Sequence, residues 1–315
     1  MNNIYIDPDS KIPPPGEPGE KFKVLDDALL PPVDEFKRFM KIFFKRKIVL
    51  FGFTVVVLII LMAIFADFVS PFDPNRQNLG NVLALPGGEH ILGTDTLGRD
   101  QLSRIIHGSR IALLVGVSTV LISAISGTVI GLLAGYAEGL LSSLLMRSTD
   151  ALLSIPALIF ALILVNVMGG GVLAVVLAVS ITLLPGYIRL INGQVLSIKQ
   201  NDYVLAARTM GANKARIMFR HILPNCLSPL IVQMTMMMGV AIMMEAGLSF
   251  LGLGISPPTA SWGEMCFAGY RFLLTHPLMS IVPGLAIMLL VFSFNMVGDG
   301  LRDALDPKMR GTSTD

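Results

Sequence analysis

Six long apolar runs constrain this chain more than any other feature of its sequence. A helix that spans the hydrocarbon core of a bilayer needs about 20 apolar residues, and it satisfies its backbone polar groups internally. Hydrophobic residues make up 53% of the chain and charged residues 15%, whereas an average soluble domain is about 25% charged. We therefore expect an all-α polytopic membrane protein with six transmembrane helices, in residues 48–70, 111–135, 150–168, 172–191, 229–251 and 280–300.

The two ends of the chain differ from these runs in composition. Residues 1–32 contain seven of the nineteen prolines and little apolar content, which predicts a disordered tail. In residues 33–47, five large apolar side chains recur at helical spacing among basic residues. This pattern is typical of an amphipathic helix in the membrane interface, although it also fits the start of the first span with its positive flank. Residues 306–315 are expected to form a short C-terminal tail.

Lysine and arginine are distributed unevenly between the two sides that six spans create. Nineteen of the 24 lie on the side of the N-terminus and five on the opposite side. Basic residues accumulate on the cytoplasmic side of membrane proteins. We therefore expect both termini in the cytoplasm, residues 48–110 as the first span with an extracytoplasmic loop, and residues 111–305 as the core of the membrane domain.

The sequence lacks the motifs of the common enzyme classes. No lysine is followed by Ser or Thr, so the phosphate-binding pattern G-x-x-x-x-G-K-[ST] is absent. The four histidines are scattered, and none belongs to an H-E-x-x-H zinc motif. A formal net charge of +2 gives no reason to expect nucleic-acid binding. We expect no catalytic residue, metal site or cofactor, and the energy for any transport must then come from partner subunits.

The second apolar run carries three glycines in strict register. Gly127, Gly131 and Gly135 are four residues apart and therefore share one face of a helix. Small residues at this spacing allow two membrane helices to approach closely. Glycine is also common in membrane helices in general, so the stripe indicates either a packing face or ordinary composition.

The loop at 192–228 contains signals for two short helices. Asn201 or Asp202 can cap a first helix, and Gly211 can end it with a left-handed turn. Asn213 can cap a second helix over residues 214–222.

Pro224 is expected to stop that second helix. The small Ala206 and Ala207 would let another protein approach the backbone of the first helix. The segment is therefore either a rigid docking element or a simple connection whose positive charge only sets the topology.

The residues at 202–225 resemble the cytoplasmic "EAA" loop of permease subunits of ATP-binding-cassette (ABC) importers. Two positions depart from that pattern, because Leu205 replaces the usual glutamate and His221 replaces the usual isoleucine. The departure at Leu205 removes any salt bridge that the glutamate would make to an ATPase. The resemblance implies that an ATPase-coupling element is formed by Asp202, Ala206, Ala207, Arg208, Gly211, Arg216, His221, Leu223 and Pro224.

Four further segments resemble one branch of that family, the C-type permeases of dipeptide, oligopeptide and nickel importers. They lie in order at 90–110, 131–156, 244–263 and 294–308. The resemblance implies the type I ABC importer permease fold in a bacterial inner membrane. It also implies three kinds of partner: a homologous B-type permease, two cytoplasmic ATPases that bind ATP and Mg, and an extracytoplasmic solute-binding protein. Peptides are the implied substrate, with nickel, glutathione or another small solute as alternatives.

A few side chains inside the spans are candidates for contact with a transported solute. Glu245 is the clearest, because a charge at the centre of a span costs about 2.5–3.5 kcal/mol and should face protein or water. It can line a pathway or make a structural hydrogen bond. Met237 and Met244 can likewise line a tolerant pathway or fill gaps in a helix bundle.

The segment 71–110 holds a turn-rich cluster that includes Asp95, Arg99 and Asp100. It is expected either to border the outer mouth and the binding-protein contact, or to form a cap without a partner. Arg99 with Asp95 or Asp100 can be a local ion pair, which contributes little if it is exposed.

Two other functions remain as alternatives, a self-contained secondary carrier and a non-transporting assembly factor. A carrier predicts charge relays inside the membrane, of which the sequence shows little, and an assembly factor would not need a glycine-jointed loop.

Overall fold

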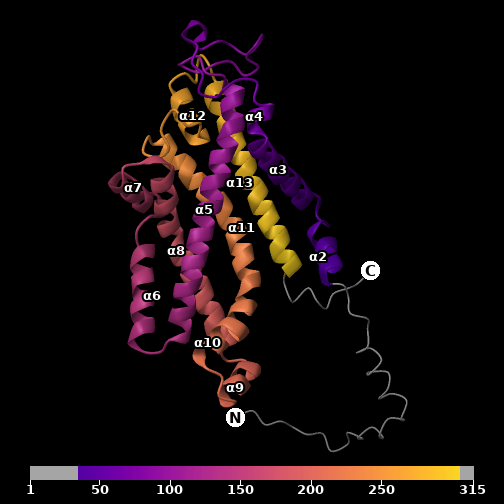
Figure 1. Cartoon of the computed structure of the whole chain (residues 1–315), viewed down its shortest axis with the longest axis vertical. Helices are drawn as coiled ribbons and strands as arrows, with labels where there is room; N and C mark the ends of the chain where they lie inside the picture. The colour runs from indigo at the N-terminus through magenta and orange to yellow at the C-terminus, as the bar shows by residue number, and fades with distance from the viewer. Residues whose placement is uncertain (1–34, 306–315) are drawn as a thin grey trace, which may run out of the picture.

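The computed structural model describes residues 35–305, and within them the chain is almost entirely helical (Figure 1). Within residues 35–305, five helices are long and apolar enough to cross a membrane, and a bent helix pair brings the number to six if it counts as one span. This confirms the all-α membrane fold. The tails at 1–32 and 306–315 lie outside the described residues. The elements are α2 (Glu35–Phe43), α3 (Lys47–Ile64), α4 (Ala66–Val69), η2 (Leu79–Asn81), α5 (Gln101–Tyr136), α6 (Leu140–Leu153), α7 (Ala157–Met168), α8 (Gly171–Ile198), α9 (Asp202–Thr209), α10 (Lys214–Arg216), the π-helical η3 (Ile217–Ile222), α11 (Leu223–Phe250), α12 (Trp262–Tyr270) and α13 (Leu278–Leu305).

The helices form an elongated bundle with two distinct ends (Figure 1). One end carries α12 and a cap of irregular chain at residues 70–100, and we call it the cap end. The opposite end carries α9 and α10, and we call it the α9 end. The long helix α5 runs through the bundle and packs most extensively against α8. Helices α11 and α13 pack against each other, and α3 lies against α13 and α5.

The third span differs from the continuous helix that hydropathy predicts over 150–168. Helices α6 and α7 are bent by 93° at a break between Leu153 and Ala157. The physical cause is Pro156, which has no amide hydrogen for the helix ladder and disfavours helical backbone in the residue before it. The chain reverses direction between α7 and α8, where Gly169, Gly170 and the first residue of α8, Gly171, all have positive φ.

The segment predicted as an interfacial helix forms a separate helix, α2. A turn at residues 44–46 divides it from α3, so it is not the start of the first span. Phe43 is buried close to Gly300 of α13 and packs edge-to-face against Phe53. Its placement in a membrane interface stays a prediction.

The cap joins the first span to α5. Asp100 is the N-cap of α5, and its Oδ2 accepts from the amide of Ser103 at 2.8 Å. Residues 101–110 therefore form the first part of the long helix, and the irregular part of the predicted range 48–110 ends at Asp100.

Candidate functional site

Helix α9 ends at a left-handed glycine, as the sequence predicts. Gly211 has φ +83°. Its amide donates to the carbonyl of Arg208 at 3.0 Å, and the amide of Ala212 donates to the carbonyl of Ala207 at 3.1 Å. These two bonds form a Schellman cap, which requires positive φ at the position of Gly211. The joint after α9 is thus closed by backbone bonds and is a defined turn.

The second short helix begins where the sequence predicts. The side chain of Asn213 accepts from the amide of Arg216 at 2.7 Å and caps α10. Asn201 occupies the N-cap position of α9, but its side chain makes no capping bond.

The prediction that Pro224 stops this second helix is wrong. Helix α10 continues through the π-helical η3 into α11, and Lys214–Phe250 forms one candidate span. Pro224 lies in the first turn of α11, where its missing amide costs little. The wider π turn before it gives the chain room to continue. Because α8 extends to Ile198, the non-spanning segment is also shorter than the predicted 192–228.

The first short helix presents one face to the bundle and the other outward. Val204 and Ala207 are buried, while Leu205 is exposed and Met210 is 82% exposed. The α9 end thus offers an uncovered, partly apolar surface beside a rigid turn. Of the other residues predicted for coupling, Asp202, Ala206, Arg208, Gly211, Arg216 and Pro224 are exposed, and His221 and Leu223 are partly buried.

A cavity of about 940 Å³ lies between α9 and the neighbouring ends of α5 and α8. Lys199, Arg208 and Lys214 line it together with one acid, Glu138. Lys199 Nζ donates to the carbonyl of Gly135 at 3.2 Å and ties the end of α8 to α5. The hollow beside α9 therefore carries a net positive charge.

Two of the candidates inside the fifth span, Glu245 and Met244, are buried within the chain, and Met237 is partly buried. Glu245 is buried, and its Oε1 accepts from Ser249 Oγ at 2.9 Å. Of the two roles considered for Glu245, this geometry fits the structural hydrogen bond and not the lining of a pathway. Met244 is part of the buried core and Met237 packs against it, whereas the neighbouring Met243 is exposed.

The three glycines of α5 face α8. A Cβ atom on Gly127, Gly131 or Gly135 would lie 2.5, 2.8 and 2.7 Å from the Cβ atoms of Tyr187, Ile191 and Val195. Side chains cannot approach this closely, so the two backbones are near each other because the glycines lack Cβ atoms.

A buried charge cluster at the cap end joins distant parts of the chain. Arg99 Nε donates to Asp95 Oδ2 at 2.6 Å, and both side chains are buried, in contrast to the exposed pair considered from sequence. Arg104 is 1% exposed, and its Nη2 donates to Glu264 Oε2 at 3.1 Å. Burial raises the pKa of Glu264, and Arg104 opposes that rise. Sequence reasoning missed Arg104 and Glu264, because no local pattern links residues 160 positions apart.

The described residues contain little that could ligate a metal or react. Among residues 35–305, no three His, Cys, Asp or Glu side chains lie close enough to hold a metal ion. Cys226 and Cys266 are free, and burial raises the pKa of the Cys266 thiol to about 11. Thiols in such surroundings are weak nucleophiles.

Comparison with protein families gives two matches. Residues 127–311 match the model of the "Binding-protein-dependent transport system inner membrane component". Residues 35–86 match the "N-terminal TM domain of oligopeptide transport permease C". Together the two matches include α2, α3, the last ten residues of α5 and all later helices.

Two permeases of known transport systems agree with these matches. The chain is 42% identical to a di/tripeptide transport permease of Pseudomonas aeruginosa, over 91% of this chain and 97% of that protein. It is 44% identical to a glutathione transport permease of Escherichia coli, over 81% of this chain and 85% of that protein. A solved methionine ABC transporter, MetNI, matches 62% of this chain and 94% of its own, with 19% identity and a TM-score of 0.48. The chain belongs to the family of inner-membrane permease components of binding-protein-dependent transport systems, in the branch of oligopeptide permease C.

Proposed function

We propose that this chain is one permease subunit of an ATP-driven importer of short peptides. The α9 end faces the cytoplasm, together with both termini, and the cap end faces outward. This orientation follows from the nineteen basic residues on the N-terminal side. Relatives named as di/tripeptide and dipeptide permeases, 42% and 40% identical, support the substrate class.

The observation that carries this proposal is the glycine-jointed turn between α9 and α10. Because α10 runs through η3 into α11, a force on α9 is transmitted to a helix that crosses the whole bundle. Two separate ATPase subunits supply the force, since the chain has no phosphate-binding motif of its own. ATP-driven closure of the ATPases shifts the permeases between two conformations.

An ion pair on the face formed by α6 and α8 supports a second permease as partner. Arg189 Nη2 lies 2.6 Å from Asp150 Oδ1, and the two side chains are 54% and 53% exposed. Charges in membrane helices face protein or water, because contact with hydrocarbon is costly. This face is therefore covered by a homologous B-type permease or by a water-filled pathway between the two. A solute-binding protein delivers substrate at the cap end.

A glycine substitution tests the coupling role. Gly211→Val forces a β-branched residue into positive φ and strains the turn after α9. Gly139→Val is the matched control, because Gly139 has φ +73°, open space around it and a position in the α5–α6 connection. We expect Gly211→Val to lose peptide uptake and stimulated ATP hydrolysis while it still inserts and co-purifies with a second permease. Wild-type uptake in Gly211→Val would show that the turn at Gly211 does not couple ATP hydrolysis to transport.

Glutathione is the second candidate substrate, because relatives 44% identical carry that name. Uptake of labelled dialanine and labelled glutathione by the same reconstituted transporter separates the two. Uptake of glutathione alone would replace the peptide proposal.

A further inference from the structure

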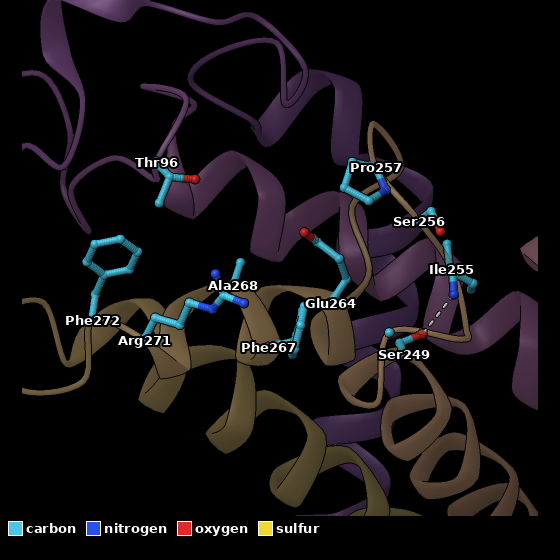
Figure 2. Close-up of a pocket in the computed structure, with 11 residues that line it drawn as sticks. Thr96, Ser249, Ile255, Ser256, Pro257, Glu264, Phe267, Ala268, Arg271 and Phe272 are labelled. Carbon is cyan, nitrogen blue, oxygen red and sulfur yellow. Dashed lines mark hydrogen bonds between the residues drawn. The ribbon is translucent and has the colours of Figure 1, made fainter. Parts of the chain in front are cut away.

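A second cavity, of about 440 Å³, opens at the cap end between α12, the end of α11 and the cap (Figure 2). One face of α12 and the residue after it supply Glu264, Phe267 and Arg271. The cap supplies Thr96, and the loop before α12 supplies Ser256. The pocket thus combines an aromatic wall, hydroxyl groups and both signs of charge.

The two charges of the pocket lie along one face of the same helix. Glu264 and Arg271 are seven residues, or two helical turns, apart, which places their Cα atoms about 10 Å from each other. In Figure 2 the side chain of Glu264 points away from this helix, the side chain of Arg271 lies along the helix toward Ala268, and Thr96 lies across from both. One acidic and one basic side chain therefore line the same pocket.

The charge of Arg271 is not compensated within the described chain. Asp95, Arg99, Arg104 and Glu264 form a cluster with two charges of each sign. Arg271 is exposed and forms no ion pair with any residue in 35–305. A guanidinium in a concave, partly apolar site is well suited to bind a carboxylate.

We propose that this pocket receives a short zwitterionic peptide, with its carboxylate on Arg271 and its ammonium on the carboxylate of Glu264. An extended chain advances about 3.3–3.6 Å per residue, so the termini of a di- or tripeptide lie about 7–10 Å apart, comparable with the separation of about 10 Å between the Cα atoms of the two charged residues. Phe267 and Phe272 give apolar contact that does not depend on one particular side chain. Arg104 holds Glu264 Oε2 and fixes the carboxylate in place. This assignment rests on the proposed function, since it requires that the cap end faces outward and that the cargo is a peptide.

Uptake measurements test the role of Arg271. The complete transporter is reconstituted with its binding protein, and uptake of radiolabelled dialanine is measured for wild type, Arg271→Gln, Arg271→Lys and Arg76→Gln. Arg76 is an exposed cation of the cap outside the pocket, and it serves as the control. We expect Arg271→Gln to lower peptide uptake per ATP hydrolysed at least about tenfold, because it removes a charge-assisted hydrogen bond. Arg271→Lys should retain most uptake, and Arg76→Gln all of it.

The outcomes separate this inference from the proposed function. Wild-type uptake in Arg271→Gln would overturn the inference and leave the peptide importer intact. A raised KM for the loaded binding protein, with an unchanged ratio of peptide to ATP, would also overturn it and assign the pocket to protein docking. Absence of peptide uptake in the wild-type transporter would instead reject the proposed function.

Photo-crosslinking gives a readout that does not depend on transport. Benzoylphenylalanine at Phe267, inside the pocket, should crosslink to labelled dialanine, and Arg271→Gln should abolish this product. The same probe at the fully exposed Leu274, outside the pocket, should give none. Equal crosslinking at both positions, or crosslinking at Phe267 that does not depend on Arg271, would overturn the proposal.

Discussion

Arg104 shows how one buried side chain can hold the cap end together. It contacts Glu264 and approaches Asp95 to 3.8 Å, and it donates to the backbone carbonyls of Pro74 and Pro258. These partners come from the cap, from the loop before α12 and from α12 itself, and the cap is far from the other two in sequence. A buried cation needs several partners to offset its desolvation, and here those partners fix three segments relative to one another.

Replacement of Arg104 should therefore destabilise the protein strongly. Arg104→Met leaves Glu264 buried without its cation, and loss of one member of a buried pair costs about 3–5 kcal/mol. The control is Arg46→Met, since Arg46 pairs with Asp303 near the surface, where a pair contributes about 0–1 kcal/mol. The free energy of unfolding in detergent measures both, and equal losses would contradict the structural role of Arg104.

The negative charge of Glu245 is not expected to be needed for transport. Its carboxylate is buried and bonded to Ser249 of the same helix, and a glutamine carbonyl can accept the same bond. Glu245→Gln should therefore insert normally and transport peptide within about twofold of wild type, since the hydrogen bond from Ser249 is kept. Uptake and membrane content are measured together. A tenfold loss of uptake at normal content would return Glu245 to the pathway.

At the level of elements, the contact of α5 with α8 depends on the absence of side chains. A Cβ on Gly131 would lie 2.8 Å from Ile191 Cβ and 2.9 Å from the carbonyl oxygen of Ile188. Neither atom can rotate away, so Gly131→Ala should separate the helices and cost about 1–3 kcal/mol.

Gly193 of α8 is the matched control for that substitution. Apart from the nearby backbone of its own helix, no atom lies within 4 Å of its added Cβ, and alanine is about 0.5–1 kcal/mol better than glycine in a helix. The two substitutions should therefore change the free energy of unfolding in opposite directions. Equal stability of the two variants would show that α5 and α8 are not held at the described distance.

Sequence reasoning succeeded where the signal was local. The turn at Gly211 and the cap at Asn213 depend on a few neighbouring residues, and both are present in the structure. It failed at Pro156, because hydropathy averages over a run of apolar residues and does not register a missing amide hydrogen. It also failed at Pro224, where a proline was expected to end the helix. The π-helical segment before this proline lets the helix continue.

For the whole molecule, hydropathy predicted a helical bundle but not which helices pair. The packing of α5 against α8, and of α3 against α13, depends on contacts between distant runs that look alike in composition. The pocket at the cap end was likewise inaccessible from sequence, because Thr96, Ser256 and Glu264 come from separate segments. A single chain also leaves many large apolar side chains exposed, which is expected of a surface that meets lipid and a partner permease.

The orientation of the bundle decides from which side of the membrane each of its ends can be labelled. Leu274 lies at the cap end and is fully exposed, and Leu140 begins α6 at the α9 end and is also exposed. A membrane-impermeant maleimide should label Leu274→Cys in intact cells without an outer-membrane barrier, and it should label Leu140→Cys only in inverted vesicles. The native thiols interfere little, because Cys226 is buried and the pKa of Cys266 is about 11, so thiolate is scarce. Labelling of Leu140→Cys from outside would reverse the orientation. The coupling turn would then lie on the side without ATP, and the peptide pocket on the side away from the binding protein.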